Sequence, residues 1–119
     1  MKQKLSEAEL AVMEILWDEG PMRAGRITEV AGEKHGWERN TVYTLINRLI
    51  KKGAVKREEP NFLCTPIIQK DEIRKQETQK LLEKMYGGSI NLFMKSFLAE
   101  SKISDEEYEE LKRLIEDHQ

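Results

Sequence analysis

Apolar residues in the first half of the chain recur at the three- and four-residue intervals of amphipathic helices. The first stripe consists of Val12, Ile15, Leu16 and Trp17. Ser6 and Glu9 ahead of it have the spacing of a capping box. Leu5 and Leu10, on either side of Ser6, are placed to form a hydrophobic staple. Because a Gly-Pro pair at residues 20–21 ends the pattern, a first helix is predicted before it.

Two more helices and two strands are predicted up to residue 68. A short helix that ends at Gly36 is indicated by Ala24, Ile27, Val30 and Ala31, after a candidate strand at Met22-Arg23. A third helix, with Gly53 at its C-terminus, is indicated by Val42, Leu45, Ile46, Leu49 and Ile50. Residues 54–59 and 62–68 are typical of short strands joined by a tight turn at Glu59-Pro60-Asn61. This order predicts a mainly α fold with a small β-wing, with a winged helix-turn-helix domain at residues 1–67.

The segment from residue 68 to residue 119 carries narrower apolar stripes on three predicted helices. Gly87-Gly88 separates the first two, and Ser104 with Glu107 repeats the capping-box spacing at the third. Stripes this thin cannot form a core alone, so an α-helical dimerisation domain is predicted. Folding back on the same chain is the alternative. The residues predicted to face a second copy are Leu81, Leu82, Met85, Leu92, Phe93, Phe97, Leu111 and Leu114.

Composition favours a soluble protein, since 39% of the 119 residues are hydrophobic and 35% are charged. The N-terminus lacks the apolar core of a signal peptide and no 18-residue apolar run occurs, so a cytoplasmic location is expected. Cys64 is the only cysteine, which excludes an internal disulfide and any paired-cysteine metal or redox site. A small apolar residue on a strand is favoured for it over a redox-sensing thiol.

The distribution of charge is more informative than the net charge of −2. Residues 67–119 hold 9 Lys/Arg and 12 Asp/Glu, whereas residues 39–57 hold six Lys/Arg and no carboxylate. An ordinary solvated helix face mixes Glu with Lys for solubility. A basic run without acids therefore indicates a nucleic-acid partner.

The side of the third helix opposite its apolar stripe carries short hydrogen-bonding side chains. At 100° per residue this side holds Asn40, Thr44, Asn47 and Lys51, flanked by Thr41 and Arg48 and by Tyr43. Asn can bond adenine through two hydrogen bonds, and Thr offers a hydroxyl and a methyl group to bases in the major groove. Base reading is therefore predicted for Asn40, Tyr43, Thr44 and Asn47. Phosphate binding is predicted for Arg39, Thr41, Arg48, Lys51, Lys52, Lys56 and Arg57.

An enzyme is disfavoured, and no catalytic residue, metal ligand or cofactor is expected. His35 and His118 have no Cys or carboxylate at ligand spacing, and no Gly-rich phosphate loop occurs. The acidic run at residues 105–110 is explained by a helix N-terminus. A winged-helix module that binds proteins instead of DNA is the alternative function. Such a surface would expose apolar or aromatic anchors, for which Tyr43 is the one candidate.

The chain resembles the winged-helix repressors of the penicillinase-repressor (BlaI/MecI/CopY) family. The resemblance rests on LSEAELAVMEILWDEGP at residues 5–21, W-x3-TVYTLINRLIKKG from Trp37, the short wing, and KMYGG at residues 84–88. It implies a homodimeric transcriptional repressor that binds a palindromic operator in double-stranded DNA and dimerises through its C-terminal helices. It also places Asn40, Thr41, Tyr43, Thr44, Asn47 and Arg48 in the recognition helix and the wing at Lys56 to Phe62.

Two departures from the family pattern concern induction. The copper-responsive branch carries paired cysteines near the C-terminus, and their absence here argues against metal sensing of that kind. In the antibiotic-resistance branch an Asn-Phe bond in the second tail helix is cleaved. Aligned without gaps from Tyr86, that bond falls at Ser96-Phe97, where the Phe is present and the Asn is not. This argues against a membrane sensor protease as a partner.

Overall fold

The chain forms two compact units in the computed structural model, which describes residues 4–100 and 103–118. The units span Met1–Lys75 and Gln76–Gln119. Their boundary lies later than the predicted one after residue 67, because Ile68 and Ile73 pack in the core of the first unit. Trp17 holds the segment after strand β3 (Leu63–Pro66) against the first unit, since its indole N–H donates a hydrogen bond of 2.9 Å to the carbonyl of Ile68.

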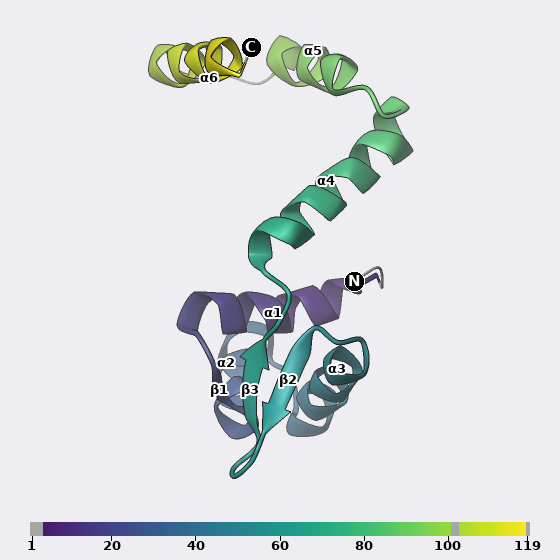
Figure 1. Cartoon of the computed structure of the whole chain (residues 1–119), viewed down its shortest axis with the longest axis vertical. Coiled ribbons are helices and arrows are strands. Elements are labelled where there is room, and N and C mark those ends of the chain that lie inside the picture. Colours follow the sequence, from purple (N-terminus) through teal and green to yellow (C-terminus); the bar gives the residue numbers. More distant parts are fainter. Residues whose placement is uncertain (1–3, 101–102, 119) are drawn as a thin grey trace. The chain divides into compact units, whose positions relative to one another are not determined.

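The first unit is a helical domain with a small sheet (Figure 1). Its helices are α1 (Glu7–Glu19), α2 (Ala24–His35) and α3 (Arg39–Lys51), followed by the start of α4 (Lys70–Tyr86). Its strands are β1 (Met22–Arg23), β2 (Val55–Glu58) and β3 (Leu63–Pro66). Strand β3 lies in the middle and pairs antiparallel with both others, so the predicted ribbon gains Met22–Arg23 as a third strand. The predicted fold class, mainly α with a small β-wing, is confirmed.

Helix α1 begins as the sequence predicts. The Ser6 hydroxyl accepts from the Glu9 N–H at 3.1 Å, and the Glu9 carboxylate accepts from the Ser6 N–H at 2.7 Å. Leu5 is buried and Leu10 packs against the core, as a hydrophobic staple requires. The reciprocal bonds satisfy two N–H groups that a helix N-terminus otherwise leaves unpaired. The start of α1 is thereby fixed beside the core.

The core of the first unit is built from all of its elements. The fully buried side chains include Val12, Met13, Leu16, Ile27, Val42, Leu49 and Cys64. Cys64 lies on the central strand β3, where burial raises its pKa to about 11 although the charge of Arg57 acts in the opposite direction. It is therefore a small core residue with a protonated thiol, which agrees with the predicted structural role.

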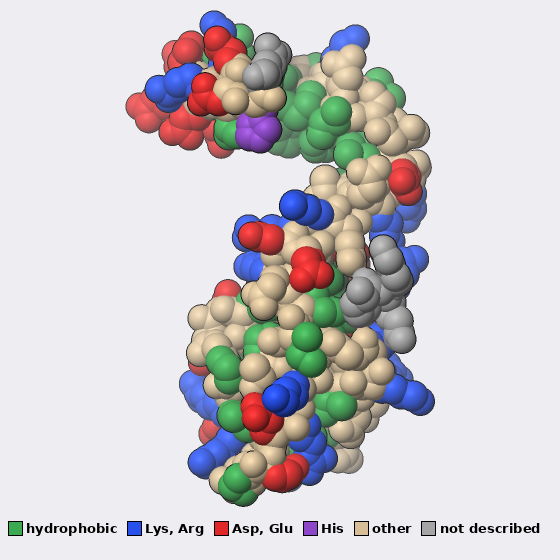
Figure 2. Space-filling model, viewed as in Figure 1, with side chains coloured by type: hydrophobic (Ala, Val, Ile, Leu, Met, Phe, Trp, Pro, Cys, Tyr) green, Lys and Arg blue, Asp and Glu red, His purple; other side chains and the backbone are tan. Residues whose placement is uncertain are grey.

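The second unit consists of the rest of α4 with α5 (Ile90–Glu100) and α6 (Asp105–Asp117). Ser104 caps α6 by accepting from the Glu107 N–H at 3.1 Å. Phe93 joins α4 to α5, because its ring centroid lies 5.3 Å from that of Tyr86 and 5.8 Å from that of Phe97. Hydrophobic side chains nevertheless show on the visible face of α5 (Figure 2). None of the helices in residues 4–100 and 103–118 has the length and apolar character needed to cross a membrane.

Candidate nucleic-acid interface

Helix α3 has one buried side and one exposed side. Val42, Leu45, Ile46 and Leu49 are buried in the core, where α3 packs against α1 and α2. The exposed residues are Arg39, Asn40, Thr41, Thr44, Asn47, Arg48 and Lys51. The structure thus brings together the short polar side chains that the sequence predicted for one face. Tyr43 differs from them, since it is only half-exposed and packs against the core.

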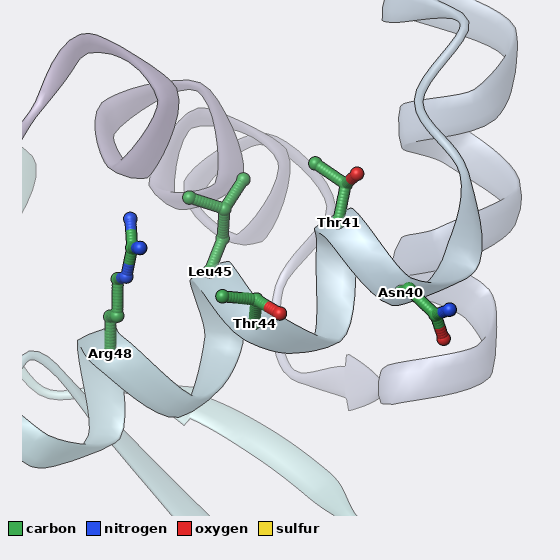
Figure 3. A pocket seen from close by; sticks show the side chains of 5 residues that line it. All are labelled: Asn40, Thr41, Thr44, Leu45 and Arg48. Carbon is green, nitrogen blue, oxygen red and sulfur yellow. The ribbon is translucent and has the colours of Figure 1, made fainter.

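An open hollow of about 320 Å³ runs along part of this face (Figure 3). Its lining residues are Asn40, Thr41, Thr44, Leu45 and Arg48. The first turn of α3 holds no acidic residue, and Glu38 ahead of it makes no side-chain cap. Among the described residues no side chain caps this turn. Its N–H groups and the positive end of the helix dipole therefore favour an anion.

The cations of α3 differ in their partners. Within the described residues, Arg39, Arg48 and Lys51 take part in no ion pair, so their charges remain available to a ligand. All three are exposed. They supply the uncompensated positive charge that phosphate binding requires.

Lys52, by contrast, is turned inward. Its ammonium group lies 2.6 Å from the Glu9 carboxylate and also donates to the carbonyl of Lys4 at 2.8 Å. The Glu9 side chain is only 2% exposed. Burial alone would raise the pKa of Glu9, but hydrogen bonds from Lys52 and the Ser6 N–H and the Lys52 charge together lower it. Because Lys52 compensates a buried carboxylate, we leave it out of the phosphate-binding set.

The wing carries two cations that have acidic neighbours. Lys56 lies 3.8 Å from Glu58, and Arg57 forms an ion pair with Glu59. Both pairs are solvent-exposed, and such pairs are worth only about 0–1 kcal/mol. A phosphate can therefore replace either carboxylate at small cost. The positive charges of the wing therefore become available only when a ligand displaces Glu58 and Glu59 from Lys56 and Arg57.

Aromatic rings connect α3 to the wing. The Tyr43 and Phe62 rings meet edge to face at a centroid distance of 5.6 Å and an angle of 84°. The Arg57 guanidinium lies 3.7 Å from the centroid of Phe62, and that of Arg39 lies 4.9 Å from the centroid of Tyr43. Both distances are within the range of cation–π attraction.

The contacts of Lys52 with Glu9 and of Tyr43 with Phe62 are not predicted from the sequence. A signal for the first was present, because Glu9 falls on the same helical stripe as Val12 and Leu16 and a buried carboxylate requires a cation. For Tyr43 no local signal exists, since Phe62 belongs to a distant hairpin. No group of three or more His, Cys, Asp or Glu residues among the described ones is arranged to hold a metal ion.

The sequence pattern of the family described as "Penicillinase repressor" matches residues 5–117. The chain belongs to this family. The penicillinase repressor of Bacillus licheniformis is 29% identical over 117 residues, which cover 97% of this chain and 91% of that protein. The methicillin resistance regulatory protein MecI of Mammaliicoccus sciuri is 30% identical over 114 residues, which cover 94% of this chain and 93% of that protein. The predicted family is thereby confirmed, and with it the expectation that the chain is not an enzyme, since penicillinase repressors are DNA-binding regulators.

Solved structures of the repressor BlaI match part of the chain. The DNA-binding domain of the repressor BlaI superposes with a TM-score of 0.55 at 30% identity and covers 60% of this chain and 93% of that one. The monomeric form of Bacillus licheniformis BlaI in complex with the blaP half-operator gives a TM-score of 0.53 at 30% identity. This match covers 60% of this chain and 90% of the BlaI chain. The winged-helix fold of the first unit is therefore that of the penicillinase repressor family.

The candidate cleavage position of this family lies within a helix here. Ser96 and Phe97 are both on α5, and Phe97 stacks on Phe93. A protease acts on extended backbone, so cleavage at this bond would require α5 to unwind first. The predicted cleavage position is therefore helical, and the expected Asn is absent from it.

Proposed function

We propose that this protein is a homodimeric transcriptional repressor that acts in the cytoplasm and binds a palindromic operator through the major groove. The observation that carries the proposal is the exposed side of α3, where short polar side chains lie between three cations that have no acidic partner among the described residues. Support comes from the penicillinase repressor and MecI as relatives and from the BlaI monomer bound to a half-operator.

The proposal divides the roles of the α3 side chains by their chemistry. Asn40, Thr44 and Asn47 have short hydrogen-bonding arms and are assigned to base edges. Phosphate contacts are assigned to Arg39, Thr41, Arg48 and Lys51, with Lys56 and Arg57 from the wing. Phosphate contacts set affinity and its salt dependence, whereas base contacts set the preferred sequence.

The second unit is proposed to hold the dimer together. Leu81, Met85, Leu92, Phe97 and Leu114 have side chains 46–61% exposed in the single chain. Phe93 and Leu111 are half-buried, and Leu82 is buried. Large exposed apolar surfaces of this kind mark interfaces. A two-fold dimer presents two identical recognition helices, so its half-sites should lie about one helical turn (~34 Å) apart, or a multiple of it.

A binding selection on randomised duplex DNA tests this function. We expect the wild-type protein to enrich a palindrome at one fixed salt concentration. Asn47→Ala should relax the preference at one symmetric pair of positions, because a lost bidentate contact to adenine removes roughly 1–3 kcal/mol of discrimination per half-site. Thr44→Ala should act at a different pair. Thr78→Ala, an exposed threonine on α4, is the matched control and should leave the preference unchanged.

The selection also decides against the alternative of a protein-interaction module. If Asn47→Ala and Thr44→Ala both return the wild-type sequence preference, α3 is not the reader. If the wild type enriches no sequence at all, DNA recognition itself is refuted. The exposed face of α3 does not favour the alternative, since none of the large exposed hydrophobic side chains in the described residues lies on this helix.

A further inference from the structure

Four side chains form a continuous series from the first turn of α3 to the wing. In order they are Arg39, Tyr43, Phe62 and Arg57, which we call the arginine–ring stack. The guanidinium of Arg39 lies 4.9 Å from the Tyr43 ring, the Tyr43 and Phe62 rings are 5.6 Å apart, and the guanidinium of Arg57 lies 3.7 Å from the Phe62 ring. Each contact is of an attractive type, edge to face between the rings and cation to face at both ends.

Phe62 is held firmly in this series. Its backbone has a φ of +53°, a left-handed conformation that bulky residues rarely adopt, and Asn61 before it has a φ of +71°. Its carbonyl accepts a 3.0 Å hydrogen bond from the N–H of Ala24, the first residue of α2. Its ring packs against the core. Phe62, in the turn of the hairpin directly before β3, therefore links this turn to α2 and α3 at once. Strained backbone of this kind concentrates at functional sites.

We propose that Tyr43 and Phe62 are positioning residues, which fix the wing beside α3 and hold Arg57 and Arg39 where they contact phosphates of one half-site. The inference rests on the proposed function. Tyr43 is thereby assigned a positioning role in place of the base reading predicted from the sequence, since its half-buried ring already contacts Arg39 and Phe62. What Tyr43 contributes is its ring, and its hydroxyl is dispensable.

The stack leaves the arginines able to bind. A guanidinium lying on a ring uses its face, so its N–H donors remain directed outward in its own plane. In the free protein the Nε–H of Arg57 donates to the carboxylate of Glu59, whose side chain is 62% exposed. A phosphate oxygen offers the same acceptor chemistry as that carboxylate. Phosphate thus replaces Glu59 while Arg57 stays on the ring of Phe62.

The test measures salt dependence on the full-length protein. The probe is a duplex enriched by the wild type from a randomised library, titrated over a series of KCl concentrations. Arg57→Met should lower the slope of log K against log salt by about 0.9 per subunit, the value of one phosphate contact. Phe62→Leu should lower it similarly although no charge is removed. The double variant should fall no further, because Phe62 acts through Arg57.

Controls separate positioning from loss of fold and from base reading. Phe62→Leu combined with Arg48→Met should give additive reductions, since Arg48 is outside the stack. Thermal unfolding shows whether Phe62→Leu folds, and if it does not, Tyr43→Leu cycled against Arg39→Met makes the same measurement. Tyr43→Phe should keep both the salt slope and the preferred sequence of the wild type, because it retains the ring.

The outcomes are distinct. A wild type that enriches no DNA overturns the proposed function and this inference together. A wild type that binds while Phe62→Leu and Tyr43→Leu keep its salt slope overturns the inference alone. Additive reductions in the Phe62→Leu and Arg57→Met pair also overturn it. A changed base preference in Tyr43→Phe would return Tyr43 to base reading.

Discussion

The two units of this chain bury their apolar residues to very different extents. In the first unit, helices and strands from every part of the sequence share one core, and many of its side chains have no exposed surface. In the second unit, Leu82 is the one buried hydrophobic residue among those described, while nine large hydrophobic side chains are 42–61% exposed. An apolar side chain left in water forfeits roughly 1.5–3 kcal/mol relative to burial.

This difference in burial matches two different requirements of a DNA-binding repressor, one for each unit. A recognition surface needs side chains held in fixed positions, which a complete core provides. A dimerisation surface needs apolar area that remains available until a second copy covers it. The following predictions test this division, from the largest expected effect to the smallest.

A core truncation should distinguish the units most clearly. Leu16 has no exposed surface, so Leu16→Ala should lower the free energy of unfolding of the first unit by about 2–5 kcal/mol. Leu114 is 56% exposed, and Leu114→Ala should leave the unfolding of the first unit unchanged. Both tryptophans, Trp17 and Trp37, lie in the first unit, so urea unfolding followed by tryptophan fluorescence reports on it alone. Equal effects of the two variants would contradict the division.

Removal of one partner of the Glu9–Lys52 pair should have the next largest effect. Breaking a buried pair costs roughly 3–5 kcal/mol, and the partial exposure of Lys52 places Glu9→Gln at about 3 kcal/mol. Combining Glu9→Gln with Lys52→Met should cost less than the two single changes added together. Glu7→Gln, an exposed residue of the same helical turn, is the matched control. Additive costs in urea unfolding would mean that the pair does not couple α1 to α3.

The same pair makes the stability of the first unit depend on pH. The pKa of Glu9 is lowered from its ordinary value of 4.5, so folding favours the ionised carboxylate. Its contribution is therefore complete above about pH 4.5 and is lost as the pH falls through the lower pKa of the folded protein. Unfolding free energies measured between pH 3 and pH 6 should fall less steeply toward acid for Glu9→Gln than for Glu7→Gln. Parallel curves for the two variants would exclude Glu9 as the responsible group.

Charges placed on the exposed apolar residues of the second unit should weaken the proposed dimer. Leu92→Glu and Leu114→Glu should each raise the dimer dissociation constant about 100-fold, or roughly 2.7 kcal/mol, since a buried unpaired charge opposes association. Sedimentation at micromolar concentration measures the change. Gln79→Glu adds the same charge at a polar, exposed position of α4 and should remain dimeric. A wild type that sediments as a monomer would refute this use of the second unit.

The smallest effect concerns single cations of the interface. Arg48→Ala or Lys51→Ala should lower the salt slope of binding by about 0.9 per subunit on any DNA sequence. Lys52→Met should leave the slope unchanged, because its charge is committed to Glu9. Binding to an enriched duplex and to an unrelated duplex over the same salt series makes the comparison. A reduced slope for Lys52→Met would restore Lys52 to the phosphate-binding set.

The elements that the sequence predicts well are those whose signals are local. The stripe from Val42 to Leu49 predicted both the buried and the exposed side of α3, because helical periodicity alone determines them. The capping box at Ser6 and Glu9 was equally local. The grouping of Asn40, Thr44 and Asn47 followed from the same geometry.

Features that depend on tertiary contacts were not predicted. The domain boundary was expected after the second strand, but Ile68 and Ile73 return to the core of the first unit. In the sequence Lys52 is one more cation of a basic run, and only its contact with Glu9 distinguishes it from the others. Helical periodicity placed Tyr43 at the edge of the reading face, and only the fold of the hairpin brings Phe62 against it. In each case the deciding partner is far away in the sequence.

The buried thiol of Cys64 can report on the opening of the sheet in the first unit. With a pKa of about 11, only about one thiol in a thousand would be ionised at pH 8, and the complete burial of Cys64 keeps reagents from that fraction. Covalent trapping of Cys64 would therefore proceed only through molecules whose sheet has opened. Its rate measures the free energy of that opening in the same strands that carry the wing. The wing and Cys64 share strand β3. A ligand that binds the wing and stabilises it should therefore slow the covalent trapping of Cys64.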